Sequence, residues 1–241
     1  MSNRLYSKIL ASILFVASLD AAYAQETRPR AVEAGFCAGP TLGLVSPQND
    51  LYKGTAAKVG GFYGLTADVN LIRTKEFAYF STGLLFKHLH FGLEYSDFTA
   101  PYNELLNEPN IRSSYKTVYV SIPTAVKLKT DPFSDFAIFG VAGLEHGFCI
   151  YAKSNDEHLH DKNAEKINKV NQSDKISLMK ESLFAVVGVE YAILGNTKAA
   201  FGLGYNYGLN SIFKRKYKNL INNERVSANV HTIEFQFSFI F

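Results

Sequence analysis

Apolar and polar residues alternate along most of the chain with a period of two. Over residues 57–71 every second residue is apolar or glycine, while the residues between them include Lys58, Asp68 and Asn70. A β-strand is the regular structure that sends alternate side chains to opposite faces. The pattern therefore predicts a strand that covers this whole segment.

Seven further segments show the same alternation, clearly in the first four and more weakly in the last three: 117–129, 183–193, 198–208, 232–241, 33–45, 76–92 and 135–152. Strands of this length are unusual in soluble proteins, where about 5–6 residues is common. One uniformly apolar face and one glycine-rich polar face are typical of a transmembrane β-barrel. A soluble barrel such as a lipocalin would instead have its apolar face inside.

The connections between these segments are alternately short and long. The short ones lie near residues 73–75, 131–134 and 194–197, and the long ones near 46–56, 93–114, 153–181 and 210–228. In outer-membrane barrels short turns face the periplasm and long loops face outside. We therefore predict an all-β, eight-stranded antiparallel transmembrane β-barrel with periplasmic termini, short inner turns and long outer loops.

Charged residues within the strands share one parity, opposite to that of the aromatic and branched aliphatic residues. They are Lys58, Asp68, Lys127, Glu145, Glu190, Lys198 and Glu234. Facing lipid, a lysine would cost up to about 2–4 kcal/mol at the bilayer midplane. We therefore expect a polar network in the lumen, where opposite charges can pair.

An eight-stranded barrel is just wide enough for side chains to fill its interior. Phe62, Tyr119, Phe139 and Tyr151 share the inward parity and would help the charged set to close the lumen. The sequence therefore predicts a barrel that does not conduct.

The N-terminus has the pattern of a cleaved signal peptide. Arg4 and Lys8 precede an apolar stretch, residues 9–19, and a small-x-small site ends at Ala24 before Gln25. We expect residues 1–24 to direct export and residues 25–241 to form one barrel domain in the cell outer membrane.

The composition of the chain excludes several other classes of protein. Of 241 residues, 14% are aromatic and the formal net charge is only +3, which argues against disorder and against nucleic-acid binding. Two cysteines rule out a disulfide scaffold. Cys37 and Cys149 fall on opposite strands at different heights, so we expect both to be free.

The last strand ends in alternate phenylalanines. Phe235, Phe237, Phe239 and Phe241 resemble the C-terminal signal that the outer-membrane insertion machinery reads. A plain lipid-facing strand would show the same pattern, and both interpretations can hold together.

Two charged clusters lie in the predicted loops. The first is basic and could contact outer-membrane lipid and lipopolysaccharide, although an ordinary charged loop is the alternative: Lys214, Arg215, Lys216, Lys218 and Arg225. The second, over residues 156–161, carries two histidines and three carboxylates. A solvated loop is the simpler interpretation of it, and a divalent-metal site is the alternative.

The chain also resembles a known family, the PorT-like outer-membrane β-barrel proteins of Bacteroidota-type bacteria. The resemblance is carried by residues 119–123 (YVSIP) with Lys127 following, by residues 140–143 (GVAG), and by the aromatic C-terminal strand. It implies an eight-stranded outer-membrane barrel. The namesake of the family takes part in a secretion and gliding apparatus, so the resemblance implies secretion-apparatus proteins as partners.

For function, the sequence favours a non-enzymatic barrel, either an accessory of protein secretion or a structural and surface-interaction barrel. A narrow pore for small solutes and an outer-rim lipid-modifying enzyme are the alternatives. We expect no cofactor and no catalytic residues, since the Ser, His and Asp residues of the loops follow no recognisable spacing.

Overall fold

The computed structural model describes residues 30–48, 52–72, 74–95, 111–158, 167–216 and 226–241. No helix in these ranges is long and apolar enough to cross a membrane. The predicted signal peptide with its cleavage site, Ala24 and Gln25, lies outside them. The described strands are β1 (Val32–Pro47), β2 (Tyr52–Gly54), β3 (Lys58–Asn70), β4 (Ala78–Tyr95), β5 (Ile111–Lys129), β6 (Phe136–His158), β7 (Ile167–Asn171), β8 (Met179–Leu194), β9 (Thr197–Gly208) and β10 (Ala228–Ile240).

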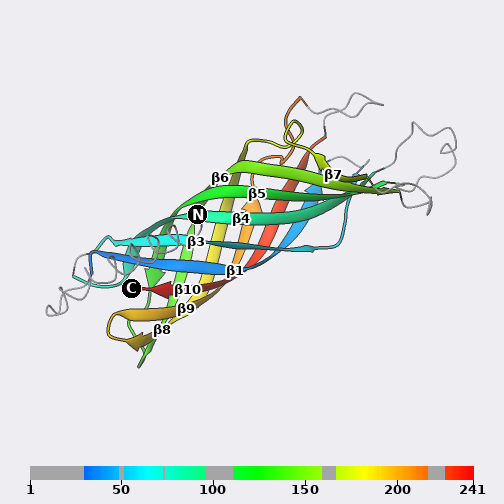
Figure 1. Ribbon diagram of the computed structural model, residues 1–241. Coiled ribbons are helices and arrows are strands. Elements are labelled where there is room, and N and C mark those ends of the chain that lie inside the picture. The colour runs from blue at the N-terminus through cyan, green and yellow to red at the C-terminus, as the bar shows by residue number, and fades with distance from the viewer. Residues whose placement is uncertain (1–29, 49–51, 73, 96–110, 159–166, 217–225) are drawn as a thin grey trace, which may run out of the picture.

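Eight of these strands close into an antiparallel barrel. Their order around the wall is β4-β3-β1-β10-β9-β8-β6-β5, and β5 pairs with β4 to complete the ring. Figure 1 shows the strands side by side and inclined around a common axis. Closure leaves no free edge in the wall, and the predicted eight-stranded antiparallel barrel is confirmed.

The two faces of the wall follow the sequence alternation. On β3, Val59, Leu65 and Val69 are exposed, whereas Phe62 and Asp68 between them are buried. On the other strands, too, large apolar side chains cover the outside while charged and small residues point inward. An exposed apolar wall around a polar interior is the arrangement expected of a barrel in lipid.

Aromatic side chains gather near both ends of the outer wall. At one end Phe36 packs edge-to-face on Phe241, with 5.9 Å between ring centroids. At the other end the ring of Tyr207 lies 4.5 Å from that of His231. Aromatic rings at two levels are typical of membrane–water interfaces, and in this chain without Trp the rings are those of Phe, Tyr and His.

The two ends of the barrel differ in their connections. Short turns join β3 to β4, β5 to β6 and β8 to β9 at the end that we call the turn end. In the β8–β9 turn Gly195 has a φ of 60°, a conformation that favours glycine. The longer connections lie at the opposite end, the loop end.

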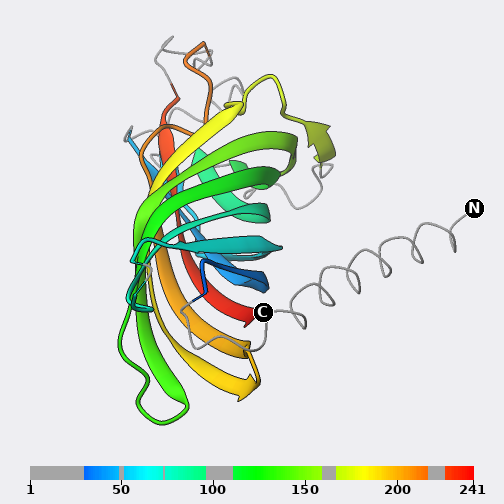
Figure 2. The ribbon, with the colours of Figure 1, turned by 90° about the vertical axis from the view of Figure 1, so that its left-hand side faces the viewer.

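Three neighbouring strands continue beyond the others at the loop end. β4 extends to Tyr95, β5 begins at Ile111 and β6 runs to His158, each farther than the alternation predicts. β2 pairs with β4 and β7 with β6 on either side of this extension. Figure 2 shows this wall of longer strands in green and teal. The described part of the chain thus includes a five-stranded sheet that extends past the barrel rim.

A β-bulge in β6 changes which side chains face the lumen above it. Tyr119 pairs with Cys149 and Val118 with Tyr151, so Ile150 is an extra residue without an opposite partner. As a result, Tyr151 is exposed, whereas Phe62, Tyr119 and Phe139 are buried as expected. The inward placement of Tyr151 predicted from parity is therefore wrong.

Candidate functional site

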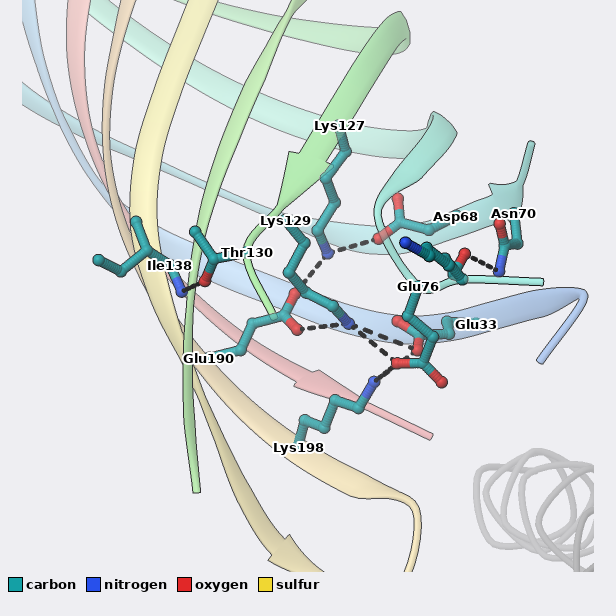
Figure 3. Close-up of polar contacts among 11 residues, drawn as sticks. Glu33, Asp68, Asn70, Glu76, Lys127, Lys129, Thr130, Ile138, Glu190 and Lys198 are labelled. Atoms are coloured by element: carbon teal, nitrogen blue, oxygen red, sulfur yellow. Dashed lines mark hydrogen bonds and ion pairs between the residues drawn. The ribbon is translucent and has the colours of Figure 1, made fainter. Parts of the chain in front are cut away.

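Carboxylates and ammonium groups form a connected network in the lumen at the turn end, which we call the turn-end ion cluster (Figure 3). Its members come from β1, β3, β5, β8, β9 and the β3–β4 turn: Glu33, Asp68, Glu76, Lys127, Lys129, Glu190 and Lys198. None of the strands involved is the direct neighbour of its ion-pair partner, so the pairs cross the lumen.

Lys127 lies between two acids in this cluster. Its Nζ is 2.7 Å from Oδ2 of Asp68 and 2.5 Å from Oε1 of Glu190. The Nζ of Lys129, two residues farther along the same face, is 3.3 Å from Oε2 of Glu190. All four side chains are buried. Buried charges of this kind are tolerated only when they are paired, so each member depends on the others.

Glu76 belongs to the β3–β4 turn and forms the half-exposed edge of the cluster. Its Oε2 lies 3.4 Å from the Nζ atoms of both Lys129 and Lys198. Burial acts to raise the pKa of the Glu76 carboxyl, but the two ammonium groups outweigh it and lower the pKa below its ordinary value. Glu76 is therefore held in its charged form beside the mouth of the lumen.

A second network, the middle ion cluster, closes the lumen farther from the turn end. Its centre is Lys87 on β4, whose Nζ lies 2.5 Å from Oε2 of Glu145 on β6 and 2.8 Å from Oε1 of Glu234 on β10. Lys180 on β8 donates hydrogen bonds to Ser182 and Asn206. The ion pairs of Lys87 thus join β4 to β6 and β10, neither of which is its neighbour in the wall.

An apolar cluster fills the lumen at the loop end, and we call it the apolar cap. Phe91 and Tyr115 stack with 5.0 Å between ring centroids, and Phe213 packs edge-to-face on Tyr115. Ile176 and Phe213 come from two loop segments that form a β-bridge with each other. Loop residues thus seal the mouth that the strands form.

The structure brings together most of the residues expected in the lumen network. Asp68, Glu190 and Lys198 join the turn-end ion cluster with Lys127, and Glu145 and Glu234 meet in the middle ion cluster.

Lys58 is the exception among them. Its ammonium group donates a hydrogen bond to Ser114, which alternates with the buried residues of β5 and faces outward. The pairing with β4 is irregular here: from Gly54 to Gly61 the chain uses two more residues than β4 uses from Leu93 to His88. Lys58 lies within that stretch and projects onto the outer face of the sheet instead of into the lumen.

Sequence reasoning missed four charged residues of the lumen, namely Glu33, Lys87, Lys129 and Lys180. Parity contained the necessary information for all of them. Lys129 shares the face of Lys127, Lys180 that of Glu190, and Glu33 that of Cys37. Lys87 alternates with outward Phe86 and His88 in a segment whose pattern is weaker.

The C-terminal phenylalanines all lie on the outer wall, where Phe235, Phe237, Phe239 and Phe241 are exposed. Cys37 and Cys149 are free, as predicted.

Of the basic loop cluster, the structure describes Lys214, Arg215 and Lys216, whereas Lys218 and Arg225 lie outside the described residues. Lys214 donates a hydrogen bond to the carbonyl oxygen of Ser173. In the second loop cluster Asp156 accepts a hydrogen bond from Ser113 at the end of β6, and residues 159–161 lie outside the described ranges. The described residues contain no group of three or more metal-binding side chains.

An apolar outer wall, two aromatic levels and a lumen filled by ion pairs define a class of protein, the membrane-spanning β-barrel of the outer-membrane type. The chain belongs to the family described as the outer membrane protein beta-barrel domain, whose model matches residues 23–214. The protein is accordingly an outer-membrane β-barrel protein.

Solved structures of other outer-membrane barrels are similar in fold. Neisserial surface protein A shares 14% identity with a TM-score of 0.45, over 89% of this chain and 98% of its own. OprG from Pseudomonas aeruginosa shares 11% identity with a TM-score of 0.45, over 88% and 97%. Ail of Yersinia pestis shares 11% identity with a TM-score of 0.36, over 88% and 100%. A search of curated proteins gives no match.

Proposed function

We propose that this protein is a closed, non-enzymatic barrel that acts through its surface and not through its lumen. In this proposal the turn end faces the periplasm and the loop end faces the cell exterior. The observation that carries the proposal is the filling of the lumen at three successive levels, by the turn-end ion cluster, the middle ion cluster and the apolar cap. Ion pairs that cross the lumen leave little room for a solute between opposite strands.

Conductance in a planar lipid bilayer tests this proposal. We expect the purified barrel to insert without producing current steps of porin size. A porin of known conductance, inserted into the same bilayer, is the positive control. Steady single-channel steps from the wild-type protein would contradict the proposal and favour the narrow pore.

The surface available for partners is the five-stranded sheet at the loop end, together with the outer loops. A tall sheet above the membrane suits either a surface-interaction barrel or an accessory of protein secretion, the role that the PorT-like resemblance suggests. Co-purification in mild detergent followed by mass spectrometry separates the two. Stoichiometric secretion-apparatus proteins would favour the accessory role, and a barrel recovered alone would favour surface interaction.

Two further contacts belong to this proposal. The basic loop cluster of Lys214, Arg215 and Lys216 would contact the phosphates of lipopolysaccharide, and its replacement by serine should weaken lipopolysaccharide binding. The exposed phenylalanines of β10 would be recognised by the insertion machinery. Replacing Phe241 should then reduce the amount of barrel in the outer membrane more than replacing Phe201, an exposed phenylalanine of β9.

A further inference from the structure

A row of basic side chains crosses the outward face of the sheet just beyond the apolar wall. On β5 Lys116 lies directly opposite His90 of β4 on one side and opposite Lys153 of β6 on the other. The bulge at Ile150 puts Lys153 on this face, because it shifts the parity of β6. Two lysines directly opposite each other repel, and a sheet gains nothing from this pairing by itself.

Lys58 adds a third ammonium group to the row. Its side chain extends over Gly92 of β4 to Ser114 of β5, two residues from Lys116 on the same face. The Lys58 ammonium group therefore lies in the electrostatic reach of Lys116 and Arg112, and also of Glu157 one row farther out. We call Lys58, Lys116 and Lys153 the basic row.

The residues directly opposite the strand lysines of the row are not acids: Lys116 faces His90 and Lys153, and Lys153 faces Asn171 of β7. An ion pair on this face lies two rows beyond Lys116 toward the loop end, where Nη2 of Arg112 is 2.6 Å from Oε1 of Glu94. Lys116 is exposed, and the Lys153 ammonium group lies 5.1 Å from the ring centroid of Tyr151. The row thus presents excess positive charge to whatever surrounds the barrel.

The basic row lies at a definite height. On β5 the outward residues from Val118 to Leu128 form the apolar wall. Ten residues at about 3.3 Å each, tilted by about 40°, span roughly 25 Å, which is the height of the apolar band of such barrels. Lys116 is the next outward residue after Val118, where the headgroups of the surrounding lipid begin.

We propose that Lys58, Lys116 and Lys153 bind the phosphate groups of a phosphorylated lipid headgroup in the leaflet that surrounds the loop end. This inference rests on the proposed function in placing the loop end at the cell exterior, where the lipid would be the glycolipid of the outer leaflet. The acyl chains of that lipid would lie against Val118 and its apolar neighbours, and His90 would flank the phosphate. Such a lipid has an anionic headgroup and apolar chains. The three ammonium groups would bind the headgroup, and the adjoining apolar wall would contact the chains.

Binding of fluorescent bisphosphoryl lipid A to the full-length protein in detergent micelles tests this site. The wild-type protein should prefer bisphosphoryl lipid A over phosphatase-treated lipid A. The variant Lys58→Gln, Lys116→Gln, Lys153→Gln should bind bisphosphoryl lipid A about 10- to 100-fold more weakly. The reason is that each lysine near a lipid surface contributes a similar amount to the binding free energy, and the three contributions are lost together. Its folding is checked by the faster migration of the unboiled protein on a denaturing gel.

A comparison variant removes three positive charges away from the row, through Arg30→Gln, Lys53→Gln and Lys75→Gln. A larger loss in the basic-row variant supports the site. Equal losses would show general charge attraction and overturn it, as would unchanged binding by the basic-row variant. Displacement of lipid A by millimolar inorganic phosphate would assign the row to free anions and also overturn the lipid site. These outcomes are independent of whether the lumen conducts, which tests the proposed function separately.

Discussion

Lys87 shows how much of this barrel depends on single side chains. It is 2% exposed and pairs with Glu145 and Glu234 from two other strands. A buried carboxylate that loses its partner keeps the cost of leaving water and loses the attraction that offsets it. The middle of the lumen is therefore stable only as a complete set.

Replacing Lys87 by methionine should lower the free energy of unfolding by about 3–5 kcal/mol, because the buried carboxylates of Glu145 and Glu234 would lose the ammonium group with which they pair. Urea unfolding in detergent, followed by loss of the fast-migrating unboiled band, measures the change. Combining Lys87→Met with Glu145→Gln and Glu234→Gln should restore much of the loss. Lys75→Met, at an exposed turn position, is the control and should change little.

The lowered pKa of Glu76 predicts that the stability of the barrel depends on pH. Its lowered pKa means that the folded state favours the charged carboxylate. The stabilisation is fully present above the ordinary carboxyl pKa of 4.5 and is lost as the pH falls through the lower folded-state value. Because the side chain is half-exposed, water screens the pairs and the effect should stay below about 1 kcal/mol.

Comparing wild-type protein with Glu76→Gln in urea between pH 3 and pH 7 measures this contribution. The wild-type protein should be the more stable one at pH 7, and the two curves should converge at low pH. A difference that grew on acidification would contradict the assignment.

At the scale of the strand, glycines mark where neighbouring strands and rings approach closely. A Cβ built on Gly188 of β8 would lie 2.1 Å from the carbonyl oxygen of Phe201 and 2.5 Å from the Phe139 ring. A Cβ on Gly140 of β6 would meet nothing within 4 Å. Both glycines have extended strand backbone, Gly188 in β8 and Gly140 in β6, but only Gly188 is closely surrounded by other atoms.

Gly188→Ala should therefore destabilise the barrel by about 1–3 kcal/mol, since the backbone of β9 must move. Gly140→Ala, the matched control, should change the free energy of unfolding by less than about 0.5 kcal/mol. The urea concentrations at the unfolding midpoints of the two variants, measured side by side, test this difference in stability. Equal midpoints would mean that the wall adjusts to a methyl group at Gly188.

Strand alternation predicts the fold well because lipid and lumen impose opposite requirements on neighbouring residues. The eight segments, the inward face of Asp68 and Lys127, and the outward phenylalanines of β10 all follow from it. Parity fails where the strand gains residues. The bulge at Ile150 turned Tyr151 outward, and the irregular stretch before Gly61 turned Lys58 outward. No local composition marks either position, because bulges are fixed by the pairing of both strands.

The contacts within the lumen were less accessible to sequence reasoning than the strands. Which lysine meets which carboxylate depends on the stagger between strands, and Lys87 of β4 meets Glu234 of β10, three strands away around the wall. Loop residues such as Ile176 and Phe213 carry no periodicity that would place them in the mouth. Alternation identifies faces, and only the three-dimensional register identifies partners.

At the scale of the whole molecule, the orientation in the membrane is the property on which the proposals depend. Lys53 at the loop end and Lys75 at the turn end are both exposed. Single cysteines can be placed there as Lys53→Cys and Lys75→Cys, with Cys37 and Cys149 replaced by serine.

A membrane-impermeant maleimide added to intact cells should label the cysteine at position 53 and not the one at position 75. After permeabilisation of the outer membrane both should react. The reverse order of labelling would invert the topology and remove the basis for the lipid site at the basic row.

The wall of this barrel is uneven in height, and this has a consequence for its neighbours. β4, β5 and β6 contain 18, 19 and 23 residues, whereas β9 and β10 on the far side contain 12 and 13. A protein that diffuses in the plane of the membrane therefore meets the extended strands β4, β5 and β6 on one side of the barrel and the short strands β9 and β10 on the other. The barrel is therefore asymmetric about the membrane normal. In a crowded membrane, the side from which a neighbouring protein approaches decides whether it can contact the extended sheet.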